Sequence, residues 1–381
     1  MSLNVRIDRI EAFDVRFPTS RWLAGSDAMN PDPDYSAAYV MIHSSVEGLE
    51  GHGFTFTIGR GNELCVAAIR AMAPMLEGRA LADICSDMGA FWRSLAGDSQ
   101  LRWLGPEKGV VHLALAAVVN AVWDLWAKRE GKPVWRLIAD LSPEELVRTI
   151  DFRHITDALD RSEAQEIVER AQSGRGAVLP VLEQQGYLAY TTSAGWLGYP
   201  DDKIRTLCAQ AVADGWGAIK IKVGRDLQDD VRRCAIVREA IGERLLMIDA
   251  NQVWEIPEAI SHVRALAEFD PYWIEEPVSP DDILGHASVR RAVTPIRVAT
   301  GEHAHNRVMF KQLPDALSIS GALEGRMLEH AGPMHDQFCD PIRIERGRYQ
   351  MPQAPGFSTQ LKPDSLRDHL FPEGAAWQTR R

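Results

Sequence analysis

Alternation of apolar and polar residues at the start of the chain predicts a small antiparallel sheet. The alternation runs through residues 5–17, returns at 37–45 and recurs in a Gly-flanked stretch at 53–59. A period of two places successive side chains on opposite faces of a strand. We therefore expect residues 4–58 to form a β-meander.

Helical spacing of apolar residues follows the meander. It occurs at 61–76, at about 81–96 and most clearly at 109–130, where apolar residues recur every three or four positions. Together with the meander, these helices predict an N-terminal α+β capping domain over residues 1–150.

The second half of the chain alternates short apolar segments with helical patterns. We expect parallel strands, because each apolar segment is followed by a stretch long enough for a crossover helix. The segments lie at 187–193, 218–224, 245–252, 272–277 and 296–303. This order predicts a (β/α) TIM-like barrel, the catalytic domain, over residues 151–340. The C-terminal tail, residues 341–381, is expected to pack back on the capping domain.

Charged residues end four of these segments at nearly constant spacing. Lys222 and Asp249 are 27 residues apart, Asp249 and Glu275 are 26 apart, and Glu275 and Glu302 are 27 apart. One strand, one helix and two loops make a unit of this size in a (β/α) barrel. Because the carboxyl ends of barrel strands face one mouth, these side chains are expected to meet in one pocket.

The residue types in this pocket predict acid–base chemistry beside a metal ion. Lys220 and Lys222 are two residues apart in a strand, so both point into the barrel. Asp249, Glu275 and Glu302 supply only oxygen ligands, which suit Mg²⁺ better than zinc.

This combination suits removal of a proton from the carbon next to a carboxylate. The metal ion can stabilise the resulting enediolate while a lysine takes the proton. We expect neighbouring positive charge to lower the pKa of that lysine. Asn251 shares the face of Asp249 and could orient a ligand or touch the substrate.

Each signal has a simpler explanation when it is taken alone. Two lysines spaced by one residue are most often a solvated strand edge, and Glu275-Glu276-Pro277 is most often a strand end with a surface salt bridge. Coincidence is a poor explanation for three evenly spaced carboxylates that each close an apolar segment. The set as a whole favours a catalytic site.

Short motifs in this region resemble the enolase superfamily, mandelate racemase type. They are the Lys-x-Lys pair, DAN at 249–251, WIEEP at 273–277 and GEH at 301–303. Longer segments resemble the L-fuconate dehydratases of that superfamily and lie at 16–40, 98–110, 190–200, 301–312 and 352–358. The resemblance spans nearly the whole chain. It implies a lyase of fucose and acid-sugar metabolism, which uses Mg²⁺ to dehydrate a six-carbon sugar acid to a 2-keto-3-deoxy acid.

The resemblance also implies roles for individual residues. Lys222 is expected to be a catalytic base or acid, and Lys220 is expected to contact the substrate during catalysis. The implied metal ligands are Asp249, Glu275 and Glu302. Candidate substrate or site contacts are Gly25, Ser26, Asp27, Tyr35, Lys220 and Asn251.

A long segment without periodicity, residues 18–35, is expected to form a lid over the barrel mouth. Loops of this length tend to be functional or disordered. As a lid, it would use Ser26, Asp27 and Tyr35 to contact sugar hydroxyls and Trp22 to exclude water. A mobile surface loop is the alternative.

The βα pattern breaks after a helix at 306–313. If the spacing held, the next charged strand ends would fall near residues 329 and 356, but residue 314 opens a segment that resembles the family's eighth strand. The material for strands six and seven, about 50 residues, is therefore absent.

These two strands matter because in this family they supply an aspartate and a histidine on the substrate face opposite the lysines. No residue here matches either one, whereas Glu324 matches a family residue near the substrate carboxylate. Two open strand edges are costly, which favours an internal segment that the printed sequence omits. A deletion variant and a branch that has lost the dyad are the alternatives.

Composition limits the partners and the compartment. A formal net charge of −11 argues against nucleic acid and anionic membranes as partners. The chain start lacks a signal-peptide pattern, and no run approaches the roughly 18 apolar residues of a spanning helix. Five scattered cysteines indicate free thiols in a reducing compartment. We expect a cytoplasmic homo-oligomer that acts on a small sugar acid.

Three functions remain open from the sequence. The first is a Mg²⁺-dependent dehydratase of L-fuconate or a close stereoisomer. The second is a racemase or epimerase of a hydroxy acid. The third, if the deletion is real, is a non-catalytic homologue that binds acid sugars.

Overall fold

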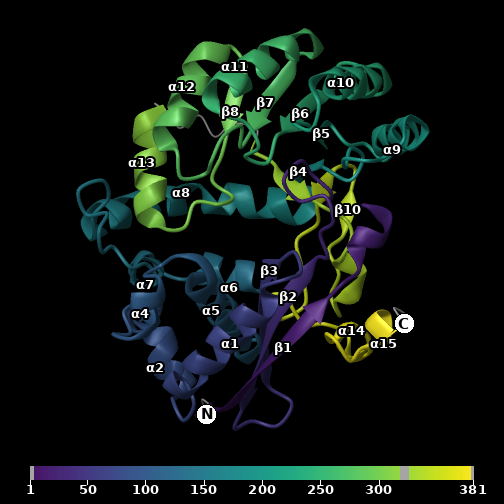
Figure 1. Cartoon of the computed structure of the whole chain (residues 1–381). Coiled ribbons are helices and arrows are strands. Elements are labelled where there is room, and N and C mark those ends of the chain that lie inside the picture. Colours follow the sequence, from purple (N-terminus) through teal and green to yellow (C-terminus); the bar gives the residue numbers. More distant parts are fainter. Residues whose placement is uncertain (1–3, 318–325, 379–381) are drawn as a thin grey trace.

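The molecule has two parts, one above the other in Figure 1. The computed structural model describes residues 4–317 and 326–378. The lower part holds the N-terminal strands and helices, and the upper part holds parallel strands with helices outside them. The C-terminal end of the chain returns to the lower part, beside β1 (Ile7–Arg16).

The lower part is built on the predicted meander. β1 pairs antiparallel with β2 (Ser36–Ser44), and β2 pairs antiparallel with β3 (Glu50–Thr57). Helices follow the sheet, and their apolar sides share one core with it. This shared core confirms the α+β cap. They are α1 (Asn62–Met72), α2 (Leu81–Ser86), α3 (Met88–Ala96), α4 (Leu101–Leu104) and α5 (Gly109–Arg129), followed by α6 (Val134–Asp140) and α7 (Pro143–Arg148).

Helix α5 lies directly on β3 and forms the centre of this core. A Cβ atom at Gly53 would come within 2.4 Å of the Ala121 backbone nitrogen, so only glycine permits this approach. By length and composition alone α5 could span a membrane, and the expectation that no stretch qualifies is wrong. More than half of that stretch is buried here, as in the central helix of a globular core.

The upper part repeats the predicted strand–helix unit. Its neighbouring parallel strands are β4 (Tyr187–Thr191), β5 (Ala218–Lys222), β6 (Leu245–Asp249), β7 (Pro271–Glu275) and β8 (Arg297–Ala299). The helices that follow them are α9 (Asp201–Ala213), α10 (Leu227–Ile241), α11 (Ile256–Ala265), α12 (Ile283–Val293) and α13 (Arg307–Leu317). Apolar side chains between strands and helices form a second core.

The barrel is open on one side in the part of the chain that the structure describes. β9 (Leu328–His330) pairs in parallel with β4, while the other end of the sheet stops at β8. Among residues 4–317 and 326–378, no strand pairs with the outer edge of β8. This agrees with the predicted loss of strands six and seven.

The segment that resembles an eighth strand does not begin as a strand at residue 314, and its residues 318–325 lie outside the described part of the chain. Residues 314–317 continue helix α13, because Leu313 and Leu317 lie four residues apart and belong to a buried cluster with Ala287 of α12. The strand that pairs with β4 begins later, at Leu328.

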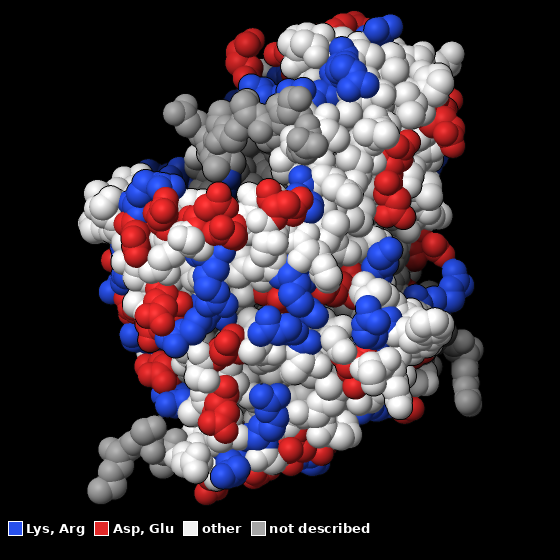
Figure 2. All heavy atoms as spheres, turned by 90° about the vertical axis from the view of Figure 1, so that its left-hand side faces the viewer, with Lys and Arg blue, Asp and Glu red and all other residues white. Residues whose placement is uncertain are grey.

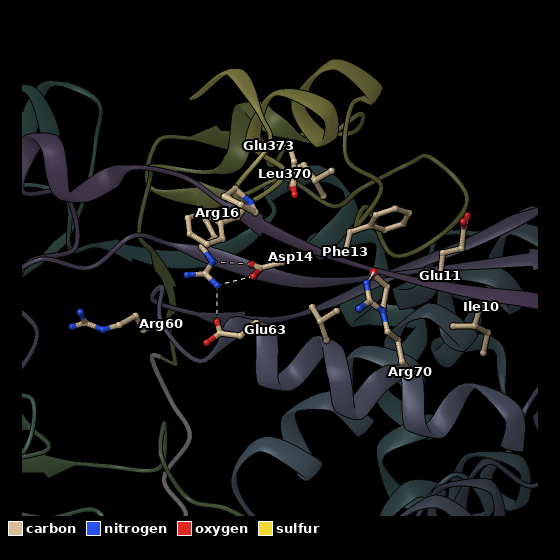
Figure 3. Close-up of a pocket in the computed structure, with 14 residues that line it drawn as sticks. Ile10, Glu11, Phe13, Asp14, Arg16, Arg60, Glu63, Arg70, Leu370 and Glu373 are labelled. Carbon is tan, nitrogen blue, oxygen red and sulfur yellow. Dashed lines mark hydrogen bonds and ion pairs between the residues drawn. The ribbon is translucent and has the colours of Figure 1, made fainter. Parts of the chain in front are cut away.

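The C-terminal residues cross from the barrel to the cap. β10 (Ile344–Glu345) and β11 (Arg348–Tyr349) form a hairpin on β4, and α14 (Pro363–His369) and α15 (Ala375–Gln378) lie beside β1. Figure 3 shows the pocket between them, where Arg16 reaches Asp14 and Glu63, each at 2.6 Å. The Arg16 guanidinium also lies 3.9 Å from the ring centroid of Phe371. The contact with Phe371, together with the Phe371 amide that donates to the Asp14 carbonyl at 2.8 Å, attaches the tail to the cap.

Helix α8 (Arg161–Gln185) connects the two parts and is mostly exposed. Ion pairs also join the parts, including Arg307 with Glu107 at 2.6 Å and Lys311 with Asp157 at 2.9 Å. Positive and negative side chains are interspersed over the face shown in Figure 2.

We expect Gly53→Ala to destabilise the cap. The added methyl group collides with the α5 backbone, and overpacking of this kind costs about 1–3 kcal/mol. Gly174→Ala in α8 is the matched control, since its Cβ atom meets open space and should add about 0.5–1 kcal/mol of stability. Urea unfolding measures both. Equal stability of Gly53→Ala and the unsubstituted protein would contradict the close packing of β3 on α5.

Candidate active site

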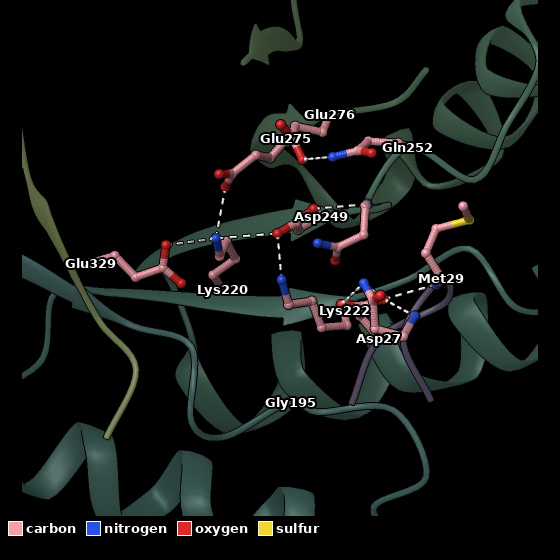
Figure 4. Close-up of polar contacts among 12 residues, drawn as sticks. Asp27, Met29, Gly195, Lys220, Lys222, Asp249, Gln252, Glu275, Glu276 and Glu329 are labelled. Carbon is pink, nitrogen blue, oxygen red and sulfur yellow. Dashed lines mark hydrogen bonds and ion pairs between the residues drawn. The ribbon is translucent and has the colours of Figure 1, made fainter. Parts of the chain in front are cut away.

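Three predicted residues lie in one row across neighbouring strands. Lys222 of β5 pairs in register with Asp249 of β6, which pairs with Glu275 of β7. Each is the last residue of its strand. The near-constant spacing in the sequence thus corresponds to one row of the sheet, and Figure 4 shows the carboxylates beside the two lysines.

Lys220 lies among three carboxylates. Its Nζ is 2.8 Å from Glu275 Oε2, 3.0 Å from Glu329 Oε2 and 3.2 Å from Asp249 Oδ2. Burial alone would lower the pKa of Lys220, but the three carboxylates raise it well above its ordinary value. Lys220 is therefore a buried cation with its partners in place.

The two carboxylates of the row differ in acidity. Burial raises the pKa of Glu275 to about 7, with the negative charge of Asp249 as the next cause. Burial would also raise the pKa of Asp249, but Lys222 and Lys220 lower it below its ordinary value. Asp249 is therefore the permanent anion of the pair.

Lys222 contacts both an anion and an aromatic ring. Its Nζ is 2.6 Å from Asp249 Oδ2 and 5.5 Å from the ring centroid of Trp196. Burial lowers the pKa of Lys222, but Asp249 outweighs it and the pKa is raised. The expectation of a lowered lysine pKa is wrong for this arrangement, because the carboxylate contact outweighs repulsion from Lys220.

Glu302 stands apart from the row. β8 ends at Ala299, which is the residue paired with Glu275, so Glu302 lies three residues beyond the strand. Within residues 4–317 and 326–378, no three Asp, Glu, His or Cys side chains gather closely enough to hold a metal ion. The spacing rule overshoots here because β8 is only three residues long.

The donor chemistry nevertheless fits Mg²⁺. Asp249 and Glu275 both direct an oxygen at the Lys220 ammonium, so a positive charge already lies between them. The Oδ1 atom of Asn251 is buried without a hydrogen-bond partner, and Glu302 lines the adjoining cavity. Carboxylate and amide oxygens are ligands of hard cations.

One cavity of about 1260 Å³ connects the end of this row with residues 18–35. The predicted site residues that line it are Gly25, Asp27, Tyr35, Lys222, Asn251 and Glu302. Ser26 does not line it, because its side chain is buried and its hydroxyl donates to the Pro31 carbonyl at 3.1 Å. Lys220 is fully buried. Glu324 lies outside the described residues.

Residues 18–35 contact the barrel at this cavity. The Leu197 amide donates to the Ser26 carbonyl at 3.0 Å, which ties the segment to the loop after β4. The Asp27 carboxylate accepts the amides of Met29 and Asn30, so it shapes the segment itself. Trp22 is 53% exposed and does not line the cavity, so its expected role in excluding water is wrong.

Glu329 is a site residue that the sequence interpretation missed. It reaches Lys220 from β9, and the Tyr190 hydroxyl donates to it at 3.1 Å. A signal existed, because a spacing of 27 residues from Glu302 falls on position 329. The resemblance of residues 314 onward to an eighth strand obscured that signal.

A second polar group lies beside the row. His303 Nδ1 is 2.9 Å from Glu276 Oε1, and Gln252 Nε2 donates to Glu276 Oε2 at 2.7 Å. Glu276 is buried, whereas His303 lines the cavity. Neither residue takes the place of the absent dyad, since both follow strands on the lysine side of the gap.

We expect Lys220→Met to destabilise the protein by about 3–5 kcal/mol at neutral pH, because three carboxylates lose their shared buried cation. Lys311→Met is the matched control. It removes one pair with the exposed Asp157, so it should cost less than about 1 kcal/mol. Urea unfolding compares the two. A Lys220→Met loss as small as that of the control would show that the buried cluster does not hold the barrel together.

Profiles of two protein families match the chain. The mandelate racemase / muconate lactonizing enzyme N-terminal domain matches residues 32–139, and the enolase C-terminal domain-like family matches residues 203–323. The first range covers most of the cap, and the second contains the row of lysines and carboxylates.

Full-length relatives share the fold and much of the sequence. Human mitochondrial enolase superfamily member 1 is 47% identical over 98% of this chain and 97% of its own length, and its crystal structure superposes with a TM-score of 0.95. L-galactonate dehydratase from Hypocrea jecorina is 44% identical over 98% of this chain and 96% of its own length. L-talarate/galactarate dehydratase from Salmonella typhimurium, solved with Mg and L-lyxarohydroxamate, shows the same fold at 24% identity, with a TM-score of 0.69 over 96% of this chain and 93% of that one.

The alignment with the human relative shows how many aligned positions have no residue from this chain. It runs over 431 positions, whereas 98% of 381 residues is about 373, so about 58 positions have no residue from this chain. That difference is close to two of the 26–27-residue units. The domain matches and the full-length identities together show that the chain belongs to the enolase superfamily, mandelate racemase type.

Proposed function

We propose that the protein is a Mg²⁺-dependent dehydratase that converts a sugar acid, L-fuconate or a close stereoisomer, to a 2-keto-3-deoxy acid. One observation carries the proposal: two buried lysines, the buried Asp249 and the half-buried Glu275 converge beside a cavity large enough for the substrate. Buried titratable groups with shifted pKa values in such a cavity favour a catalytic site.

Asp249, Glu275 and Glu302 are the residues that would hold the metal ion. A Mg²⁺ ion held there would supply positive charge, which would acidify the proton next to the substrate carboxylate and weaken the attraction between Asp249 and Lys222. Asn251 would supply a further oxygen, since its Oδ1 atom has no hydrogen-bond partner among the residues that the structure describes.

Lys222 is the group that would move the proton. It lines the cavity, whereas Lys220 lies fully buried behind it. In its neutral form Lys222 takes the proton from C2, and as an ammonium it returns that proton to the hydroxyl leaving C3. The products are water and an enol, which becomes the 2-keto acid. This single-base route is our choice because strands six and seven, the family's source of a second acid, have no counterpart among residues 4–317 and 326–378.

The substrate class rests on the relatives. One full-length relative is an L-galactonate dehydratase, and an L-talarate/galactarate dehydratase shares 30% identity over 68% of this chain. Both names denote dehydration of a sugar acid. L-fuconate is the finer proposal and rests on the resemblance of the longer segments, including residues 16–40 and 190–200.

A binding-only function is the second candidate. The open side of the barrel favours it, since the family's histidine–aspartate dyad has no counterpart in the described chain. Racemisation of a hydroxy acid fits less well, because it needs proton delivery to both faces of one carbon and the lysines occupy one face.

We also propose a cytoplasmic homo-oligomer without nucleic-acid or membrane partners. The net charge of −11 and the free cysteines support the compartment and the partners. The unpaired edge of β8 supports association, because open strand edges recruit further chains.

We expect the purified protein to form a 2-keto product from L-fuconate with Mg²⁺, detected as the semicarbazone, and to lose this activity in EDTA. Lys222→Ala should lower kcat by about 10²–10⁴-fold, the usual contribution of general acid–base catalysis. Lys203→Ala is the control, since Lys203 contacts the Tyr199 ring on a neighbouring loop and should retain full activity. Binding of sugar acids without any turnover would leave the binding-only function in place of the dehydratase.

The intact mass of the purified protein tests the single-base route. The 381 residues have a mass of 42.4 kDa, and a protein of that mass would lack the two strands, as the single-base route assumes. At this chain's mean residue mass, 58 further residues would add about 6 kDa. A protein of that larger mass would contain strands six and seven, and the single-base route would be replaced by one with acids on both faces.

A further inference from the structure

Arg233 of helix α10 is only 1% exposed. It is the largest of the fully buried side chains among the described residues. Its described hydrogen bonds go to backbone carbonyls. Nη2 donates to the carbonyl of Gly195 at 2.8 Å, and to those of Trp196 and Lys222 at 3.3 Å each. Its Nε atom is buried and has no hydrogen-bond partner within residues 4–317 and 326–378. Burying a charge this way is costly, so the position calls for a function beyond packing.

These three carbonyls belong to the two segments that carry the catalytic lysine and the nearby ring. Gly195 and Trp196 lie in the loop after β4, and Lys222 ends β5. The Gly195 carbonyl also accepts the Lys222 amide at 3.0 Å. A Cβ atom at Gly195 would come within 2.3 Å of the Ile221 side chain, so the loop lies directly on the strand.

The neighbouring turn of α10 adds a second attachment. Asp230, also fully buried, accepts the Gly224 amide at 2.8 Å. Gly224 has φ +111°, a conformation that other residues rarely adopt. Asp230 and Arg233 therefore hold the backbone on both sides of the turn that follows Lys222.

We infer that Arg233 is a positioning residue, which fixes the Lys222 ammonium and the Trp196 ring relative to each other at the cavity wall. Both side chains line the cavity, with Lys222 Nζ 5.5 Å from the ring centroid. Catalysis tolerates only small displacements of a proton-transferring group, and misplacement by 1 Å can cost about 10²-fold in rate. This role rests on the proposed function of Lys222.

The test compares two arginines of one helix. Arg238 also donates to backbone carbonyls, those of Gly242 at 2.7 Å and Phe269 at 3.0 Å, but these lie before β6 and β7, at the opposite end of the barrel. Arg233→Met and Arg238→Met thus remove the same chemistry from different places. Methionine keeps a chain of similar length but leaves the carbonyls without their donor, so both variants are expected to lose some stability.

We expect Arg233→Met, measured well below its own Tm, to lower kcat on L-fuconate at least tenfold while KM changes less than threefold. Arg233→Lys should recover only part of the activity, because one ammonium cannot span three carbonyls. Arg238→Met should keep kcat within twofold. Full kcat in Arg233→Met, or an equal kcat loss in both methionine variants, would overturn the inference.

Hydrogen–deuterium exchange makes the test independent of turnover. In Arg233→Met, peptides that contain residues 193–198 and 221–225 should exchange at least tenfold faster, whereas Arg238→Met should leave them unchanged. If the unsubstituted protein converts no sugar acid, the proposed function fails but this exchange pattern still tests the positioning role. Unchanged exchange in Arg233→Met would overturn it on structural grounds alone.

Discussion

The buried ammonium of Lys220 is the interaction on which the interior of this open barrel depends. It lies on β5 and contacts carboxylates from β6, β7 and β9, so one charge links four strands. The contact with Glu329 matters most, because β9 has only the β4 ladder to hold it in the described sheet. The Tyr349 hydroxyl donates to the Glu329 carbonyl as well. Together these contacts hold β9 against the barrel where a closed barrel would use a second ladder.

Much of this arrangement was predictable from the sequence, because a regular repeat of strands and helices constrains where each strand ends. A parallel strand and its returning helix fix a repeat length, and that length placed Lys222, Asp249 and Glu275 in one row. The same reasoning misplaced Glu302, since it assumes strands of equal length and β8 ends three residues earlier. The repeat length also could not predict the direction of the lysine pKa shifts, because these depend on distances of a few ångströms between side chains.

Other residues reach the site through contacts between distant parts of the chain, which no local sequence pattern reveals. Glu329 contacts Lys220 and Trp196 lies beside Lys222, and neither shares a local sequence pattern with the lysine pair. Arg233 had no signal at all, since an arginine in an amphipathic helix is ordinarily exposed. Only the fold shows that its guanidinium turns inward to the strand end. Sequence periodicity thus predicted the row of charges, but not the side chains that hold the row in place.

Because Asp249 lies between two lysines, its charge affects the pKa of both of them. Asp249 touches Lys222 at 2.6 Å and Lys220 at 3.2 Å, so it stabilises both ammonium groups at once. Any positive charge that draws on the Asp249 carboxylate weakens that stabilisation and lowers the pKa of Lys222, which is the one of the two lysines that lines the cavity. A cation bound at Asp249 would therefore favour the neutral form of Lys222, the form that the proposed reaction needs, whereas without it the same contacts keep both lysines charged.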